Sequence, residues 1–249
     1  MTTEQQLQAR IDELESELAR RVAEAAEQDL QLQRYAADLR ETFIEEQARS
    51  QELHRSYTLT VRALASAVEA RDAYTGRHAE RVAAYGLALA EVYGLRLGDE
   101  PEIEFGFLLH DVGKVAVPDA ILFKPGPLTA AERLVMQQHP LTGAEIVRDI
   151  EFLGAARDVI RSHHERWDGS GYPDGLAGKD IPVSARIFGV ADTLDALTTR
   201  RPYREPSSMT QARAIIDAGK GSHFDPEVID AFRALPDSVV ADIRKRIGG

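Results

Sequence analysis

One stretch decides the fold: FGFLLHDVGK, at residues 105–114. Its first five residues form an apolar run of helical character that carries an ionisable pair, His110-Asp111, into an interior. Burying such a pair unpartnered is costly, and a metal ion or a tight ion network is the usual remedy. Lys114 comes four residues after His110, which predicts the same helical face. A cation there would repel a metal but suits an anion beside one, so the stretch points to phosphate.

Two further segments carry ionisable residues next to apolar ones. The pair His163-His164 follows Val159-Ile160 and precedes a glycine-rich loop. Adjacent residues on a helix point about 100° apart, so this pair can reach one metal from two angles or touch two neighbouring metals. Asp192 ends the apolar run IFGVAD, residues 187–192. Alone it suits a cap or an ion pair, but beside the histidine segments it becomes a candidate ligand.

Composition narrows the chemistry. The chain of 249 residues has no cysteine, which leaves His, Asp and Glu as its strong metal ligands. A net charge of -11 argues against a nucleic-acid partner, since such proteins normally present a basic face. No stretch approaches the roughly 20 apolar residues of a membrane span, and no secretory signal precedes the first charged segment. We therefore expect a cytoplasmic protein.

Residues 1–56 predict a long helix that pairs with a second copy of itself. The segment has neither Gly nor Pro and fits a seven-residue frame. One seam reads Ile11, Leu18, Ala25, Leu32, Leu39, Glu46 and Leu53, and the other reads Leu7, Leu14, Arg21, Gln28, Tyr35, Thr42 and Arg49. The first seam favours a parallel coiled-coil homodimer. The second becomes polar after Leu14, so a single amphipathic helix packed along its own domain remains the alternative.

Residues 57–249 predict an all-α domain. Apolar residues recur at helical spacing in three stretches, at 59–68, 82–92 and 103–108, and Gly and Pro separate the segments. Alternating runs flanked by turns, which mark strands, are scarce. The nearest candidate, residues 115–117, is too short to found a sheet.

The order of the motifs closely resembles the HD-GYP family. The resemblance rests on HDVGK at 110–114 and HHERWDGSGYP at 163–173, with RDAYTGRH at 71–78, VAD at 190–192, RPYR at 201–204 and FDP at 224–226. It covers about residues 57 to 240. An HD dipeptide alone is weak evidence, whereas this ordered set is specific. The resemblance implies an all-α HD-superfamily domain that hydrolyses cyclic dinucleotides, chiefly cyclic di-GMP.

The resemblance also implies two divalent metal ions and their ligands. His78, His110, Asp111 and Asp192 would hold one metal. Asp111 would bridge to a second metal held by His139, His163 and His164. These ligand types suit Fe, Mn, Zn or Ni, and the family more often uses Fe or Mn. A hydroxide bridging the metals would attack the phosphodiester.

Substrate contacts are implied in the same way. Lys114 would hold a phosphate oxygen, so that Lys114 and Asp111 are the predicted catalytic residues, while Arg201 and Arg204 would bind the second phosphate. Some family members carry a Glu four residues before the first ligand His, for a third metal. Tyr74 stands there, which favours two metals and pGpG as main product, with slow conversion to GMP open.

Several points stay open at the level of sequence. The loop residues Gly171, Tyr172 and Pro173 belong to a segment that the family uses for partner contacts and for shaping the site. Asp195, one turn after Asp192, is placed to orient a ligand His or a water. A phosphodiesterase for another cyclic dinucleotide, such as cGAMP, is the first alternative. A weakly active scaffold that binds diguanylate cyclases is the second.

Overall fold

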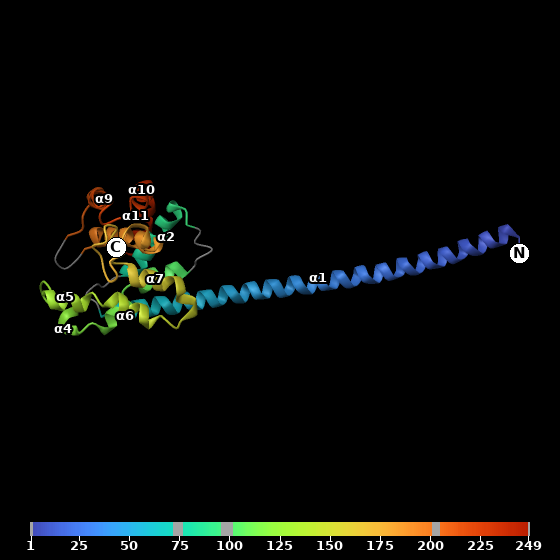
Figure 1. The fold of residues 1–249 in the computed structure, drawn as a ribbon, viewed down its shortest axis with the longest axis horizontal. Coiled ribbons are helices and arrows are strands. Elements are labelled where there is room, and N and C mark those ends of the chain that lie inside the picture. Colours follow the sequence, from blue (N-terminus) through green and yellow to red (C-terminus); the bar gives the residue numbers. More distant parts are fainter. Residues whose placement is uncertain (1, 72–76, 96–101, 201–204, 249) are drawn as a thin grey trace. The chain divides into compact units, whose positions relative to one another are not determined.

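A computed structural model describes residues 2–71, 77–95, 102–200 and 205–248 (Figure 1). Its α-helices are α1 Thr3–Glu69, α2 His78–Tyr93, α3 Glu102–Leu109, α4 Asp119–Leu122, α5 Ala130–Met136, α6 His139–Ile146, α7 Gly154–Ser162, α8 Val183–Thr198, α9 Met209–Ala218, α10 Pro226–Ala234 and α11 Asp237–Ile247. Three short 3-10 helices are η1 Val112–Ala116, η2 Glu151–Leu153 and η3 Gly178–Asp180. In the described ranges the only β-type pairing is one isolated bridge, Lys220 with Phe224. The all-α prediction is confirmed.

The long N-terminal helix is also confirmed. Helix α1 extends to Glu69, thirteen residues beyond the predicted boundary at 56, because nothing in the sequence before Arg71 breaks it. The chain forms two compact units, Met1–Tyr57 and Thr58–Gly249, and α1 contributes to both. None of the helices in the described residues is long and apolar enough to cross a membrane.

The core of the second unit lies between α2, α3, α7 and α8. Helix α2 packs on α8 and α3, and α3 packs on α7. Helices α3 and α8 are apolar around most of their circumference, as expected for helices enclosed by others. Phe107 of α3 meets Phe188 of α8 with ring centroids 5.5 Å apart, and both side chains are fully buried. These helices set the distances between the ionisable residues that they carry.

Two local predictions are wrong, and for the same reason. Helix α3 ends at Leu109, and the chain turns through His110-Asp111 into η1, so Lys114 does not share a helical face with His110. Helix α7 ends at Ser162, so His163 and His164 lie in the turn after it. In both segments the helix ends just before the ligand candidates, a termination that apolar periodicity does not reveal.

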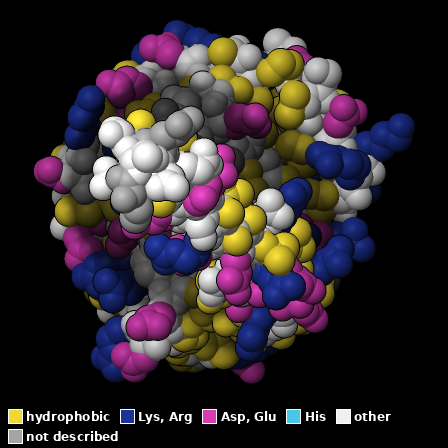
Figure 2. All heavy atoms as spheres, turned by 90° about the vertical axis from the view of Figure 1, so that its right-hand side faces the viewer, with side chains coloured by type: hydrophobic (Ala, Val, Ile, Leu, Met, Phe, Trp, Pro, Cys, Tyr) yellow, Lys and Arg dark blue, Asp and Glu magenta, His cyan; other side chains and the backbone are white. Residues whose placement is uncertain are grey.

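The surface of the described residues mixes both signs of charge. On the face shown in Figure 2, Lys and Arg side chains are interspersed with Asp and Glu. Many charged side chains of the described residues pair, as Arg233 does with Asp217 at 2.6 Å and Lys179 with Glu227 at 3.0 Å.

Gly113 allows η1 and α6 to touch. A Cβ atom at this position would lie 1.9 Å from the carbonyl oxygen of His139 and 2.6 Å from the backbone nitrogen of Gly143. Both of these atoms belong to the backbone of α6, so the clash cannot be relieved by a side-chain rotation. Gly113 therefore fixes the distance between Asp111, which precedes η1, and His139, which begins α6.

We expect Gly113→Ala to lower the free energy of unfolding by about 1–3 kcal/mol, because overpacking forces the backbones apart. Urea unfolding of the metal-free protein measures the change. Gly154→Ala is the matched control, since Gly154 has helical backbone angles and open space at its Cβ; it should be neutral or slightly stabilising. Equal stability of the two variants would contradict the packing role of Gly113.

Candidate metal centre

Three histidine rings are fixed by the same local contact. The Nδ1 atom of His110 lies 3.0 Å from the Phe107 carbonyl, that of His139 lies 2.8 Å from Met136, and that of His163 lies 2.9 Å from Ile160. Each acceptor is three residues earlier, in the last turn of a helix, where carbonyls lack intrahelical partners. A carbonyl can only accept, so Nδ1 of each ring donates and carries the proton. In the neutral ring, Nε2 is then a bare electron pair.

These electron pairs converge. His139 Nε2 lies 3.1 Å from His163 Nε2 and 3.3 Å from Asp111 Oδ1. With His164, these three residues place one ligand atom each within 4.8 Å of one another. No proton is available for a hydrogen bond between the two Nε2 atoms, because Nδ1 of each ring already holds it. Electron pairs facing each other and a carboxylate repel unless a cation lies among them, so this group fits a divalent metal ion.

Charge states in this group also suit a metal. Burial drives the pKa of His163 well below its usual value and lowers the pKa of His164 to about 3. Burial alone would raise the pKa of Asp111, but Lys114 and then His110 hold it well below its usual range. At neutral pH the imidazoles of His163 and His164 are therefore neutral and the carboxylate of Asp111 is ionised, which is the state that binds a metal.

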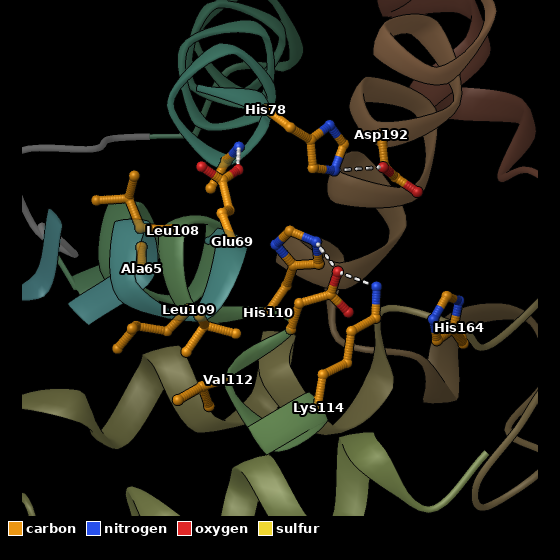
Figure 3. Close-up of a pocket in the computed structure, with 13 residues that line it drawn as sticks. Ala65, Glu69, His78, Leu108, Leu109, His110, Val112, Lys114, His164 and Asp192 are labelled. Carbon is orange, nitrogen blue, oxygen red and sulfur yellow. Dashed lines mark hydrogen bonds and ion pairs between the residues drawn. The ribbon is translucent and has the colours of Figure 1, made fainter. Parts of the chain in front are cut away.

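A second, looser group lies on the other side of Asp111 (Figure 3). Oδ2 of Asp111 is 3.1 Å from His110 Nε2, and His78 Nε2 is 3.4 Å from Asp192 Oδ1. The rings of His78 and His110 meet edge to face, with centroids 5.6 Å apart. The structure thus places the six other predicted ligands on the two sides of Asp111, which presents one oxygen to each group.

Lys114 contacts the same carboxylate. Its Nζ lies 2.7 Å from Asp111 Oδ2, the oxygen on the side of His110. The side chain reaches this oxygen from η1 and is 19% exposed. The ammonium group therefore stands at the edge of the ligand cluster.

A cavity of about 180 Å³ opens onto the ligand cluster. Ala65, Val68, Leu108 and Leu109 form an apolar part of its wall, and His78, His110, Asp111, Lys114, His164 and Asp192 form a polar part. A small anionic molecule with an apolar portion suits such a lining.

Asp195 holds His78 in place, as its position in the sequence indicated. Its Oδ2 accepts from His78 Nδ1 at 2.7 Å, and its Oδ1 accepts from Arg81 Nε at 2.7 Å. Burial opposes a charged His78, but the bond to Asp195 raises the pKa of this ring above its usual value. Since Nδ1 is the donor, the electron pair of the neutral ring lies on Nε2, toward Asp192.

Two residues in this region were not predicted from the sequence. Arg81 is buried and also donates to the carbonyl of Gly248 at 3.0 Å. Glu69 lines the cavity, and its Oε1 accepts from the backbone nitrogen of Ala79 at 2.5 Å, at the start of α2. The only sequence signal for Arg81 is its place one turn after His78. For Glu69 there is none beyond its position at the end of a long helix.

The remaining predicted site residues divide into two sets. The loop residues Gly171, Tyr172 and Pro173 are partly buried, and the ring of Tyr172 stacks on His164 with centroids 4.7 Å apart. Arg201, Arg204 and Tyr74 lie outside the described residues.

We expect Asp195→Asn to lower the free energy of unfolding of the metal-free protein by about 3–5 kcal/mol, because it leaves the buried Arg81 cation without its counterion. Chemical denaturation measures the loss. Asp217→Asn is the matched control: Asp217 forms the same two-pronged pair with Arg233, at 2.6 and 2.9 Å, but on the surface. It should change stability little, and similar losses in both variants would contradict the role of burial.

The chain is similar to a known protein family and to several known proteins. The family model described as HD domain matches residues 32–228. The 3'3'-cGAMP-specific phosphodiesterase 2 of Vibrio cholerae is 45% identical over 180 residues, covering 72% of this chain and 34% of the relative. The cyclic di-GMP phosphodiesterase response regulator RpfG of Xanthomonas campestris is 44% identical over 175 residues, covering 70% and 46%. The chain thus spans between a third and a half of the length of these relatives.

A solved structure shares the fold. The cyclic GMP-AMP specific phosphodiesterase V-cGAP3 of V. cholerae superposes with a TM-score of 0.56 at 22% identity, covering 75% of this chain and 52% of that one. The family match extends over most of the chain, and the motifs at 110–114 and 163–173 include residues of the ligand cluster. The chain belongs to the HD domain family and, within it, to the HD-GYP group.

Proposed function

We propose that this chain hydrolyses cyclic di-GMP to pGpG at the cluster around Asp111, with slow conversion to GMP as a possible second step. One observation carries the proposal: unprotonated ring nitrogens and carboxylate oxygens face one another beside a cavity that also presents the ammonium of Lys114. The relatives are named as phosphodiesterases of cyclic di-GMP or of cGAMP, and these names support a cyclic dinucleotide as the substrate.

The metal requirement follows from the ligand set. Two divalent cations would clamp phosphate oxygens and make hydroxide available near neutral pH. We propose Fe or Mn, held on one side by His139, His163 and His164 and on the other by His78, His110 and Asp192. Asp111 contributes an oxygen to each side.

Lys114 and Asp111 act together in this proposal. In the structure, Lys114 neutralises the oxygen of Asp111 that faces His110. If a cation were bound at that oxygen, the ammonium group would stand on the cavity wall as a point charge for a phosphate oxygen. Arg201 and Arg204 would bind the second phosphate.

We expect Asp111→Asn to lose most of its bound metal and all turnover, because it removes the negative charge and replaces one of the two oxygens with an amide nitrogen, which cannot bind a cation. Lys114→Met should keep its metal and lower kcat about 10²–10³-fold, as for other groups that stabilise developing charge. Elemental analysis and product chromatography with cyclic di-GMP measure both effects. Lys179→Met, on the surface, is the control. Loss of metal from Lys114→Met would refute the role given to Lys114, and a metal-free, inactive wild type would refute the function.

Two alternatives follow from other readings of the same site. The metal ligands do not select a base, so cGAMP is the competing substrate, and rates on the two dinucleotides measured side by side decide between them. A scaffold for diguanylate cyclases with little turnover needs no complete ligand set. All seven predicted ligands are present in the sequence, and four of them offer ligand atoms within 4.8 Å of one another, which favours the enzyme.

We also propose that residues 1–56 form a dimerising coiled coil and residues 57–249 the catalytic domain. Large apolar side chains along the first seam are exposed in the single chain: Ile11 is 47% exposed, Leu18 62%, Leu32 64% and Leu39 72%. Exposed apolar side chains repeated at seven-residue spacing favour a second helix. A parallel copy brings identical seam residues together.

We expect Leu32→Glu in the full chain to shift the mass from dimer toward monomer, because it places two charges in the seam. Leu30→Glu is the matched control, since Leu30 is also half-exposed but lies off both seams. Light scattering after size exclusion, over a range of concentrations, measures the mass. A monomeric wild type would end the proposal.

A further inference from the structure

His164 belongs to the group of four residues within 4.8 Å of one another, with Asp111, His139 and His163. Its ring is held differently from those of the other two histidines. The rings of His139 and His163 each donate Nδ1 to a helix-end carbonyl. Within the part of the chain that the structure describes, the His164 ring makes no such bond. A ring that lacks this contact can rotate about its side-chain bonds, and its electron pair then leaves the cluster.

An aromatic ring from the following loop takes the place of that hydrogen bond. Tyr172 stacks on His164 with centroids 4.7 Å apart and planes inclined by 30°. His139 meets the same imidazole edge to face at 5.0 Å. Stacking fixes the plane of a ring without using either of its nitrogens. Both nitrogens of His164 therefore remain available while its orientation is set.

Backbone contacts of the loop that follows His164 bring Tyr172 back to the His164 ring. The backbone nitrogen of Tyr172 donates to the His164 carbonyl at 3.3 Å. A Cβ atom on Gly171 would lie 2.5 Å from the Cα of Glu165 and 2.6 Å from the carbonyl oxygen of His164, so only glycine permits this approach. The backbone at Gly171 is thus in contact with the backbone at residues 164–166. Tyr172 is the next residue after this contact, so its ring lies close to His164.

A buried carboxylate clamps the far side of the loop. Glu165, which follows His164, accepts backbone hydrogen bonds from Asp174 at 2.7 Å, Gly175 at 3.0 Å and Leu176 at 3.1 Å. Arg161 adds a two-pronged pair with Asp174, at 2.7 and 2.8 Å. Charge-assisted bonds to three successive nitrogens leave the loop few alternative positions. The hydrogen bonds to Glu165 and the stacking of Tyr172 therefore hold the same loop, residues 171–176.

We propose that Tyr172 is a positioning residue, which aims the His164 imidazole at the metal, and that the Glu165 carboxylate keeps Tyr172 in place. The inference rests on the proposed metal centre. Residues that orient metal ligands commonly change metal affinity by about 10–100-fold when they are removed. In the described residues no hydrogen bond is formed by the Tyr172 hydroxyl, so the ring alone supplies the support.

The test uses the full chain with Mn²⁺ as the probe, and affinity is measured by chelator competition with elemental analysis of stoichiometry. Tyr172→Phe keeps the ring and should bind Mn²⁺ as the wild type does. Tyr172→Leu should weaken one of the two sites about tenfold or more. Glu165→Gln, which keeps the shape of the side chain, should weaken the same site and serves if the leucine variant does not fold.

Ser170→Ala is the control within the loop, because Ser170 bonds only to the exposed Asp168 through its side chain; it should bind Mn²⁺ normally. If Tyr172→Leu and Glu165→Gln bind Mn²⁺ like the wild type, the inference is wrong. If Tyr172→Leu binds Mn²⁺ normally but raises KM for cyclic di-GMP, Tyr172 contacts the substrate instead. A wild type that binds no Mn²⁺ would instead count against the proposed function.

Discussion

The two oxygens of Asp111 face unprotonated ring nitrogens on opposite sides, at 3.3 Å from His139 and 3.1 Å from His110. Like electron pairs at these distances repel, and Lys114 offsets only part of this repulsion, on one side. The packing of five helices and η1 holds these groups together. In the metal-free protein, the stability of the packed core therefore offsets the repulsion within the site. A bound cation would remove this repulsion.

The fold meets this constraint with helix ends more than with helix faces. His110 and His163 each follow the last residue of a helix, and His139 begins α6 just after α5. At such junctions the carbonyls of the last turn are unpaired, so each one can accept the Nδ1 proton of a nearby histidine. The same bond satisfies the helix end and directs Nε2 into the cluster. Two of the histidines are oriented by other means: His164 is stacked on Tyr172, and His78 donates to Asp195.

Apolar spacing predicted the all-α fold and the long helix, and residue type singled out His110, Asp111, His163, His164 and Asp192. The resemblance to the HD-GYP family, and not spacing, added His78 and His139 to the predicted ligands. The sequence did not predict where α3 and α7 end, since those ends depend on the turn that each histidine stabilises. Nor did it identify Arg81, because an arginine on a helix is usually exposed and its partner Asp195 is 114 residues away. Glu69 was missed because its role depends on the start of α2, beyond a helix end. The parts played by Arg201, Arg204 and Tyr74 stay predictions, because these residues lie outside the described ranges.

The contact between Arg81 and the carbonyl of Gly248 has a practical side. Arg81 holds Asp195, and Asp195 holds His78, so the last described residue of the chain is three contacts away from a ligand nitrogen. A purification tag or a fluorescent fusion attached after this residue would be bonded directly beside that series of contacts. The position of a tag can therefore affect the orientation of His78. The N-terminus, on the long helix α1, is the better place for a tag.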